Sequence, residues 1–229
     1  MNLEVLADVD AVARKGAELI AEAARAAVIS RGRFIVAVSG GRTPWLMLRD
    51  LASKDVPWEK VHLVQVDERM APADHPDRNL THLRESLLAR VPLPPHQIHA
   101  MPVDEPELEA AADRYARILV EIAGSPAVLD LVHLGLGPDG HTASLVPGDA
   151  VLTITGKDAA ATGIYQGRRR MTLTYPIINR TRRILWLVTG QDKALPLAQL
   201  QAADSSIPAG RVCQDHALVL ADRAAAAEL

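Results

Sequence analysis

The chain has 229 residues, of which 48% are hydrophobic, and this is enough to bury the core of one large α/β domain or of two small ones. Its 25 basic and 28 acidic side chains give a formal charge of −3, which excludes a whole-protein field that attracts nucleic acid or an anionic membrane. Aromatic residues make up only 3% of the chain, too few for a platform on which bases could stack.

The first predicted elements are a helix, a strand and a second helix. Residues 9–31 carry apolar side chains at helical spacing in an alanine-rich run without proline. Residues 34–38 form a short β-branched run between glycines, as expected of a strand that is buried on both faces. After a glycine turn, Thr43 suits the N-cap of the next helix and Pro44 suits its first turn.

The same order repeats along the rest of the chain. We predict helices over 80–88 and 106–123, and strands over 61–66, 129–134, 171–174, 183–188 and 217–220. Strands that alternate with helices imply a mostly parallel sheet covered on both faces, and in such sheets ligands bind beyond the carboxyl ends of the strands. No repeat, low-complexity tract or clear linker interrupts the pattern, so residues 1–229 are predicted to form one domain.

The sequence also bears on the cellular compartment. The single cysteine, Cys213, cannot form an intrachain disulfide, and the first residues lack the basic and apolar regions of a signal peptide. Charges, prolines or glycines interrupt every long apolar stretch before it reaches the length needed to cross a bilayer. We therefore expect a soluble cytoplasmic protein that binds neither nucleic acid nor membranes.

One candidate site is the loop Ser39-Gly40-Gly41-Arg42-Thr43 between a strand and a helix. We interpret it as an anion-binding loop, because backbone N–H groups, a hydroxyl and a guanidinium gather at the positive end of a helix. A plain glycine turn is an equally simple alternative. A third reading makes Ser39 the nucleophile of a serine hydrolase, although the helix begins about one turn too late for a nucleophile elbow.

Two further basic residues could bind the same anion. Arg170 precedes a predicted strand, and Lys193 follows the strand end at Thr189-Gly190. The alternatives are a solvated loop for the triplet Arg168-Arg169-Arg170 and a surface helix position for Lys193.

The glycine-rich stretch after residue 134 holds the strongest catalytic candidate. Gly135-x-Gly137-x-x-Gly140 matches a dinucleotide-binding fingerprint, but Pro138 lies within it and Pro147 follows closely, which leaves little room for the required helix. His141 follows this turn two residues after Asp139, and an imidazole beside a carboxylate suits general-base catalysis. The simpler alternative is that Asp139 only caps the turn.

The remaining polar candidates are weaker. Asp67-Glu68-Arg69 at another strand end is most simply an ion pair, although its position favours a carboxylate that faces a ligand. His96-x-x-His99 lies among prolines without a further ligand, so we expect no metal and no cofactor.

Several of these motifs together resemble the glucosamine-6-phosphate isomerase/6-phosphogluconolactonase family over residues 34–193. The long glycine-histidine motif is highly specific, and the others are modest one by one. In chain order they are Ser39-Gly40-Gly41-Arg42-Thr43-Pro44, Asp67-Glu68-Arg69 with Asn79, Gly135 to Leu145, Arg170-Met171-Thr172-Leu173-Thr174 with Asn179, and Gly190 with Lys193.

The resemblance implies a fold and a reaction. It implies an open three-layer α/β/α domain of Rossmann-like type, and hydrolysis of 6-phospho-D-glucono-1,5-lactone to 6-phospho-D-gluconate in the oxidative pentose phosphate pathway. Deaminases of the family carry a glutamate in an Asn-Glu-Pro sequence five residues after the histidine, where this chain has Val146. A valine cannot accept a proton, so the lactonase branch is favoured.

The resemblance also implies roles for residues. His141 would be the general base, oriented by Asp139, and Asp67 and Arg69 would line the sugar end of the pocket. The 6-phosphate would be anchored by Arg42, Thr43, Arg170, Lys193 and the backbone of Gly40 and Gly41, within the loop that Ser39 begins.

A sugar-phosphate sensor is the non-enzymatic alternative. We expect such a regulator to carry a DNA-binding helix-turn-helix, for which this chain has no spare segment. The expected partner is thus a small sugar-phosphate lactone, and the expected state is a monomer or a weak homo-oligomer.

Overall fold

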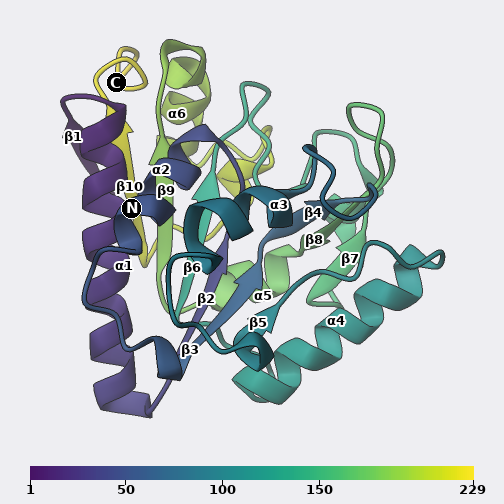
Figure 1. Ribbon diagram of the computed structural model, residues 1–229. Coiled ribbons are helices and arrows are strands. Elements are labelled where there is room, and N and C mark those ends of the chain that lie inside the picture. Colours follow the sequence, from purple (N-terminus) through teal and green to yellow (C-terminus); the bar gives the residue numbers. More distant parts are fainter.

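The computed structural model describes all 229 residues and is built on a seven-stranded sheet in which all neighbouring strands are parallel (Figure 1). The strands lie in the order β1-β10-β9-β6-β2-β3-β5. Their bounds are β1 Asn2–Leu6, β2 Phe34–Val38, β3 Val61–Gln65, β5 Ile98–His99, β6 Leu131–Gly135, β9 Ile184–Val188 and β10 Ala217–Asp222. The prediction of a mostly parallel sheet is confirmed.

Helices cover both faces of this sheet, as Figure 1 shows for α1 and α4 on opposite sides. The side chains of β2 explain how: Phe34, Val36 and Val38 pack with α1 and α2, whereas Ile35 and Ala37 belong to the cluster that contains α4, α5 and α6. The three-layer α/β/α arrangement is therefore confirmed. The helices are α1 Val9–Arg31, α2 Arg42–Leu51, α3 Asn79–Leu83, α4 Leu108–Ala123, α5 Tyr175–Arg180 and α6 Ala194–Gln201.

A second, three-stranded antiparallel sheet, which the sequence pattern did not predict, lies on the α4 side. Its order is β4-β8-β7, with β4 Asp67–Arg69, β8 Arg170–Leu173 and β7 Ala159–Ala161. Two predictions are corrected here. Residues 67–69 are a strand of their own instead of the end of a parallel strand, and residues 171–174 do not belong to the main sheet.

Several boundaries also differ from the predictions. The strand predicted over 129–134 is Leu131–Gly135, and the helix predicted over 80–88 begins at Asn79 and becomes a π-helical turn over Arg84–Leu88. The edge strands β1 and β5 were not predicted. β5 has only two residues, too few for a periodic signal.

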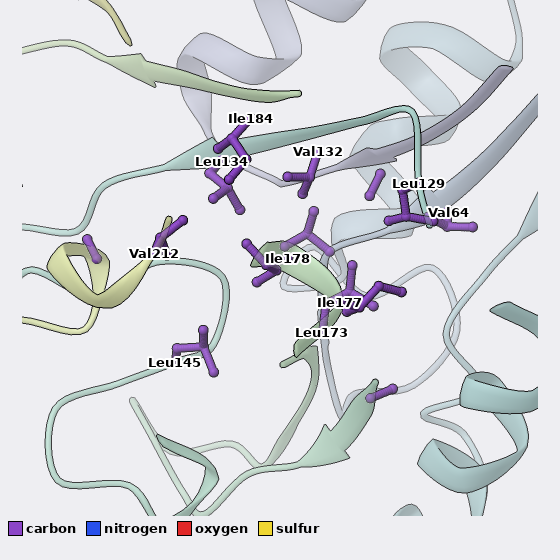
Figure 2. Packing of buried hydrophobic residues seen from close by; sticks show 14 of the residues in the cluster. Val64, Leu129, Val132, Leu134, Leu145, Leu173, Ile177, Ile178, Ile184 and Val212 are labelled. Atoms are coloured by element: carbon purple, nitrogen blue, oxygen red, sulfur yellow. The ribbon is translucent and has the colours of Figure 1, made fainter. Parts of the chain in front are cut away.

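The carboxyl ends of β2, β6 and β9 meet at one edge of the main sheet and carry the candidate loops. The loop after β6 is fixed to the core by Leu145, which is fully buried in the same cluster as Ile178 and Val212 (Figure 2). No helix is both long enough and apolar enough to cross a membrane.

Candidate active site

A cavity of about 450 Å³ lies at this edge, and every residue predicted for the site except Asp139 lines it. We distinguish two walls. The small-sheet wall consists of Asp67, Arg69, Asn79 and Arg170, and the main-sheet wall consists of residues 39–44, 135–138, 141, 143, 187, 189, 190, 192 and 193. The four loops that the sequence placed at strand ends therefore contribute to one cavity.

The main-sheet wall begins with the N-terminus of α2, where the predicted cap is wrong. Gly41, and not Thr43, is the N-cap, and no side chain caps the helix. Thr43 lies inside the helix, and its Oγ1 is 2.6 Å from Oγ1 of Thr189 at the end of β9. The uncapped first N–H groups and the helix dipole favour an anion at this point.

Ser39 lines the cavity, but its hydrogen-bond donors point into the protein. Its hydroxyl donates to the carbonyl oxygen of His133 at 2.9 Å, and its N–H donates to Nδ1 of the same residue at 3.3 Å. Burial lowers the pKa of His133 to about 3, so this imidazole is neutral and sits behind the loop. Both donors of Ser39 are used inside the protein, and the residue contributes to the wall by packing.

Lys193 belongs to the loop that begins at Thr189, the residue that contacts Thr43 of α2. Its side chain is 19% exposed, lines the cavity and lies 2.8 Å from a carboxylate oxygen of Asp192. Arg42 also lines the cavity, from an exposed position. Two cations and a helix N-terminus thus surround this end of the cavity.

Gly40 is the point where the two walls touch. A Cβ atom on Gly40 would lie 2.0 Å from Oδ1 of Asn79, so only glycine fits against this side chain. Nδ2 of Asn79 in turn donates to the backbone oxygen of Asp67 at 2.9 Å. The position of the small-sheet wall therefore depends on a missing side chain in the main-sheet wall.

Asp67 is buried in the small-sheet wall and is held by neutral donors. Ser144 Oγ donates to its Oδ2 at 2.7 Å, and Asn79 Nδ2 lies 3.3 Å from its Oδ1. Neighbouring Glu68 does not face the cavity. Its carboxylate accepts the backbone N–H groups of Asn79 and Leu80, so it fixes the start of α3.

Of the three consecutive arginines, Arg168 and Arg169 form surface ion pairs and only Arg170 lines the cavity. Arg168 pairs with Asp77 and Arg169 with Glu109, both at the surface, as the solvated-loop alternative holds. Arg170 is 4% exposed and lines the cavity. Burial, followed by the nearby charge of Arg69, lowers its pKa from the ordinary arginine value.

Arg69 and Arg170 together favour an anionic ligand. Arg69 Nη1 donates to the backbone oxygen of Asp77 at 2.9 Å, and Arg170 Nη1 and Nη2 lie 3.5 and 3.2 Å from oxygens of Ser144 and Gln166. The Nε atom of each guanidinium has no hydrogen-bond partner. Two adjacent like charges with unused donors are stabilised by a negative charge between them.

His141 and Asp139 form a close pair. Nδ1 of His141 is 2.5 Å from Oδ1 of Asp139, which also accepts the backbone N–H of His141 at 3.2 Å. Partial burial raises the pKa of Asp139, but the charge and hydrogen bonds of His141 and a hydrogen bond from Tyr165 outweigh it, so this pKa lies below the ordinary value. The carboxylate sits behind the imidazole, outside the cavity lining, and leaves Nε2 as the free ring nitrogen.

The turn before His141 is shaped to hold this ring. A Cβ on Gly137 would lie 2.1 Å from Nδ1 of His141, and the N–H of Gly137 donates to the backbone oxygen of His141 at 2.8 Å. No helix begins in the motif, which is followed only by a short 3₁₀ turn over Ala150–Thr153. The dinucleotide-binding interpretation is therefore wrong for this stretch.

Tyr165 is the residue that sequence reasoning missed. It lies in the turn between β7 and β8 and contacts His141, Asp139 and Arg170. The only signal in the sequence was an aromatic residue five positions before Arg170. Without the pairing of β7 with β8, this signal did not indicate that Tyr165 lies near His141.

Other motif residues lie elsewhere. Oδ1 of Asn179 accepts the N–H of Cys213, outside the cavity lining. His99 is paired with His62, with Nε2 and Nδ1 3.1 Å apart, and burial lowers the pKa of His99 to about 4. The structure contains no group of three or more His, Cys, Asp or Glu side chains suited to a metal ion.

Comparison with known proteins shows the family of the chain. Residues 7–220 match the family model of glucosamine-6-phosphate isomerases/6-phosphogluconolactonase. The chain belongs to this family.

Individual relatives are similar over the whole length. The 6-phosphogluconolactonase of Nostoc sp. is 36% identical over 237 residues, which cover 100% of this chain and 98% of the relative. That of Mycobacterium tuberculosis is 38% identical over 242 residues, with the same coverage. The crystal structure of 6-phosphogluconolactonase from Thermotoga maritima has a TM-score of 0.85 at 27% identity and covers 96% of this chain and 98% of that one.

Proposed function

We propose that this protein hydrolyses 6-phospho-D-glucono-1,5-lactone to 6-phospho-D-gluconate in the oxidative pentose phosphate pathway, with His141 as the general base. The observation that carries the proposal is that His141, paired with Asp139, lines the same cavity as a separate group of cations. A phosphorylated lactone needs both: a base beside its carbonyl carbon and an anchor for its phosphate. Relatives named 6-phosphogluconolactonase support this choice of substrate.

The 6-phosphate binds where positive charge gathers. The N-terminus of α2 offers the N–H groups around Gly40 and Gly41, while Arg42, Lys193 and Arg170 supply cations and Thr43 a hydroxyl. Binding energy from this remote group then holds the lactone carbonyl near His141. Asp67 and Arg69 line the part of the cavity that receives the sugar ring, and they orient the hydroxyl groups of the substrate.

The chemistry is one hydrolysis in two proton transfers. Nε2 of His141 takes a proton from water as the water oxygen bonds to C1, which gives a tetrahedral intermediate. The bond from C1 to the ring oxygen then breaks, and His141 returns the proton to that oxygen. Asp139 stabilises the imidazolium between these steps and fixes the ring orientation through Nδ1.

The deaminase activity of the family is disfavoured by Val146. This residue is 6% exposed and does not line the cavity, so neither its chemistry nor its place suits a proton acceptor. A serine hydrolase is disfavoured as well, because the hydroxyl of Ser39 is bonded to a backbone carbonyl and lies beside a neutral buried histidine.

The protein is further proposed to act as one domain over residues 1–229, as a monomer or weak homo-oligomer in the cytoplasm. The main sheet supports the first point, because it contains both the first strand, β1, and the last, β10. Light scattering after gel filtration measures the state in solution.

Hydrolysis of freshly prepared lactone, corrected for the spontaneous reaction, tests the function. We expect a strong preference of the wild type for the phosphorylated lactone over unphosphorylated gluconolactone. Arg170→Ala should raise KM for the phosphorylated lactone by roughly tenfold or more and reduce this preference, since a charge-assisted contact is lost. Arg49→Ala, an exposed position in the last turn of α2, is the control. A wild-type rate equal to background would refute the assignment.

A further inference from the structure

Tyr165 occupies a well-defined place at the tip of the β7–β8 hairpin. Its N–H donates to the oxygen of Arg168 at 2.9 Å, and the N–H of Arg168 donates back at 3.2 Å. Between them Gln166 and Gly167 have φ of 51° and 78°, as in a two-residue type I′ turn. This turn closes the hairpin tightly and fixes the side from which Tyr165 approaches the site.

The side chain of Tyr165 makes three contacts with residues of the proposed mechanism. Its hydroxyl donates to Oδ2 of Asp139 at 3.0 Å. Its ring meets the ring of His141 edge to face, with centroids 5.5 Å apart. The guanidinium carbon of Arg170 lies 4.8 Å from its centroid, in a cation–π contact.

We propose that Tyr165 is a positioning residue that couples the His141–Asp139 pair to the phosphate anchor at Arg170. The inference rests on the proposed function, since it takes His141 as the base and Arg170 as an anchor. Tyr165 does not line the cavity, so it acts through these neighbours and not on the substrate.

The hydroxyl acts on the base through Asp139. The two oxygens of this carboxylate have different donors, because His141 binds Oδ1 and Tyr165 binds Oδ2. The tyrosine hydrogen bond spreads the negative charge and moderates the pull of Asp139 on the imidazolium. Without it, the negative charge of Asp139 concentrates on the oxygen that binds His141, and the imidazolium formed during the reaction is held more strongly.

The ring acts on the anchor. Arg170 lies between the face of Tyr165 and the carbonyl group of Gln166, whose Oε1 accepts from Nη2 at 3.2 Å. Consecutive residues of one turn therefore set the orientation of the guanidinium. Loss of the ring frees Arg170 to rotate and weakens binding of the phosphorylated substrate.

Two substitutions separate these roles. Tyr165→Phe keeps the ring and removes the hydroxyl. We expect kcat to fall by about fivefold at neutral pH, KM to stay within about twofold, and the acid limb of the pH–rate profile to move to higher pH. Tyr165→Leu removes the ring too and should also raise KM for the phosphorylated lactone by about tenfold.

The control is Ile164→Ala on the same hairpin, because Ile164 is 75% exposed. It should leave both kcat and the pH profile unchanged. A pH profile of Tyr165→Phe identical to that of the wild type would overturn the inference, whatever happens to KM. So would an equal effect of Ile164→Ala.

A titration of the His141 imidazole by NMR needs no substrate and separates this inference from the proposed function. Its resonance is assigned as the one absent from His141→Gln. Tyr165→Phe is expected to shift the midpoint upward, even if the lactone assay fails and the function is wrong. An unchanged midpoint would refute the coupling even if the enzyme is a lactonase.

Discussion

The two walls of the cavity differ in what fixes their shape: backbone turns in the main-sheet wall and side-chain contacts in the small-sheet wall. The main-sheet wall is shaped by its backbone: an uncapped helix terminus at Gly41, a turn at Gly137 that holds the ring of His141, and the loop that carries Lys193. The small-sheet wall presents side chains, because Asp67 and Arg170 are fixed by hydroxyl, amide and aromatic groups from other segments.

The difference suggests that the main-sheet wall supplies fixed backbone donors for binding, whereas the small-sheet wall adjusts the charge and orientation of individual side chains. A backbone wall needs short glycine-rich motifs at strand ends, and it offers donors that stay in place through the hydrogen bonds of the sheet. A side-chain wall needs several elements to meet, but each contact can adjust a charge or an orientation. Substitutions that affect one wall and spare the other therefore test this division.

The largest effect is expected where the walls touch. In Gly40→Ala the new Cβ overlaps Asn79, which must move and take Asp67 with it. We expect kcat/KM to fall by about 100-fold, as misplacement of a site by about 1 Å can do. Gly156→Ala, where a Cβ meets no atom within 4 Å, is the matched control. Equal activity of both variants would mean that the walls are independent.

The next effect concerns the support behind the main-sheet wall and depends on pH. The pKa of buried His133 is lowered to about 3, so the unfolded chain binds a proton below about pH 6.5 while the folded chain does not. The contribution of neutral His133 to the free energy of unfolding is therefore fully present above this pH and is lost as the pH falls. Between pH 7 and pH 5 the loss from this residue is roughly 1–2 kcal/mol.

Urea unfolding of the wild type and His133→Asn at the two pH values measures this loss. Asparagine keeps an acceptor for the N–H of Ser39 but cannot take up the proton. The variant should lose less stability between pH 7 and pH 5 than the wild type. Parallel losses in the two proteins would show that His133 does not carry this dependence.

A smaller effect is expected in the small-sheet wall. Ser144→Ala removes the hydrogen bond to Oδ2 of Asp67, and kcat/KM should fall by about tenfold because the carboxylate turns. Ser86→Ala removes another buried serine hydroxyl, which donates to the backbone oxygen of His82 away from the site. The two variants should lose similar stability, and only the first should lose activity.

The smallest effect is expected at Ser39. Ser39→Ala should cost about 1 kcal/mol of stability through the lost hydrogen bond to His133 and change kcat by less than about threefold. Abolished turnover would restore the serine-nucleophile interpretation. Labelling by a fluorophosphonate probe offers a second check, and none is expected.

The contrast between the walls also explains what the sequence could predict. The strands and loops of the main-sheet wall follow from buried β-branched runs and glycine turns, and the residues of the loop from Gly135 to His141 lie together because they are adjacent in the chain. The N-cap of α2 was predicted at Thr43 but lies at Gly41. The hydroxyl of Thr43 instead contacts Thr189, which is 146 positions away in the chain. No local pattern could reveal that contact.

The small-sheet wall was only partly predictable for the same reason. Asp67 and Arg170 were chosen as site residues from their motifs, but β4 and β7 have three residues each and carry no periodic signal. Their pairing through β8 brings Tyr165, Ser144 and Asn79 around the charged groups. These partners come from three separate segments, so the network required the fold.

The catalytic role of His141 is tested most directly by the activity and the ligand binding of His141→Gln, measured side by side. We predict that kcat on the phosphorylated lactone falls by about 10²–10⁴-fold, the usual contribution of a general base. Affinity for 6-phosphogluconate, measured by calorimetry, should stay within about threefold of the wild type, because the anchor is separate from the base. A variant that keeps kcat, or that loses product affinity along with it, would contradict a catalytic histidine beside a distinct group of phosphate-binding residues.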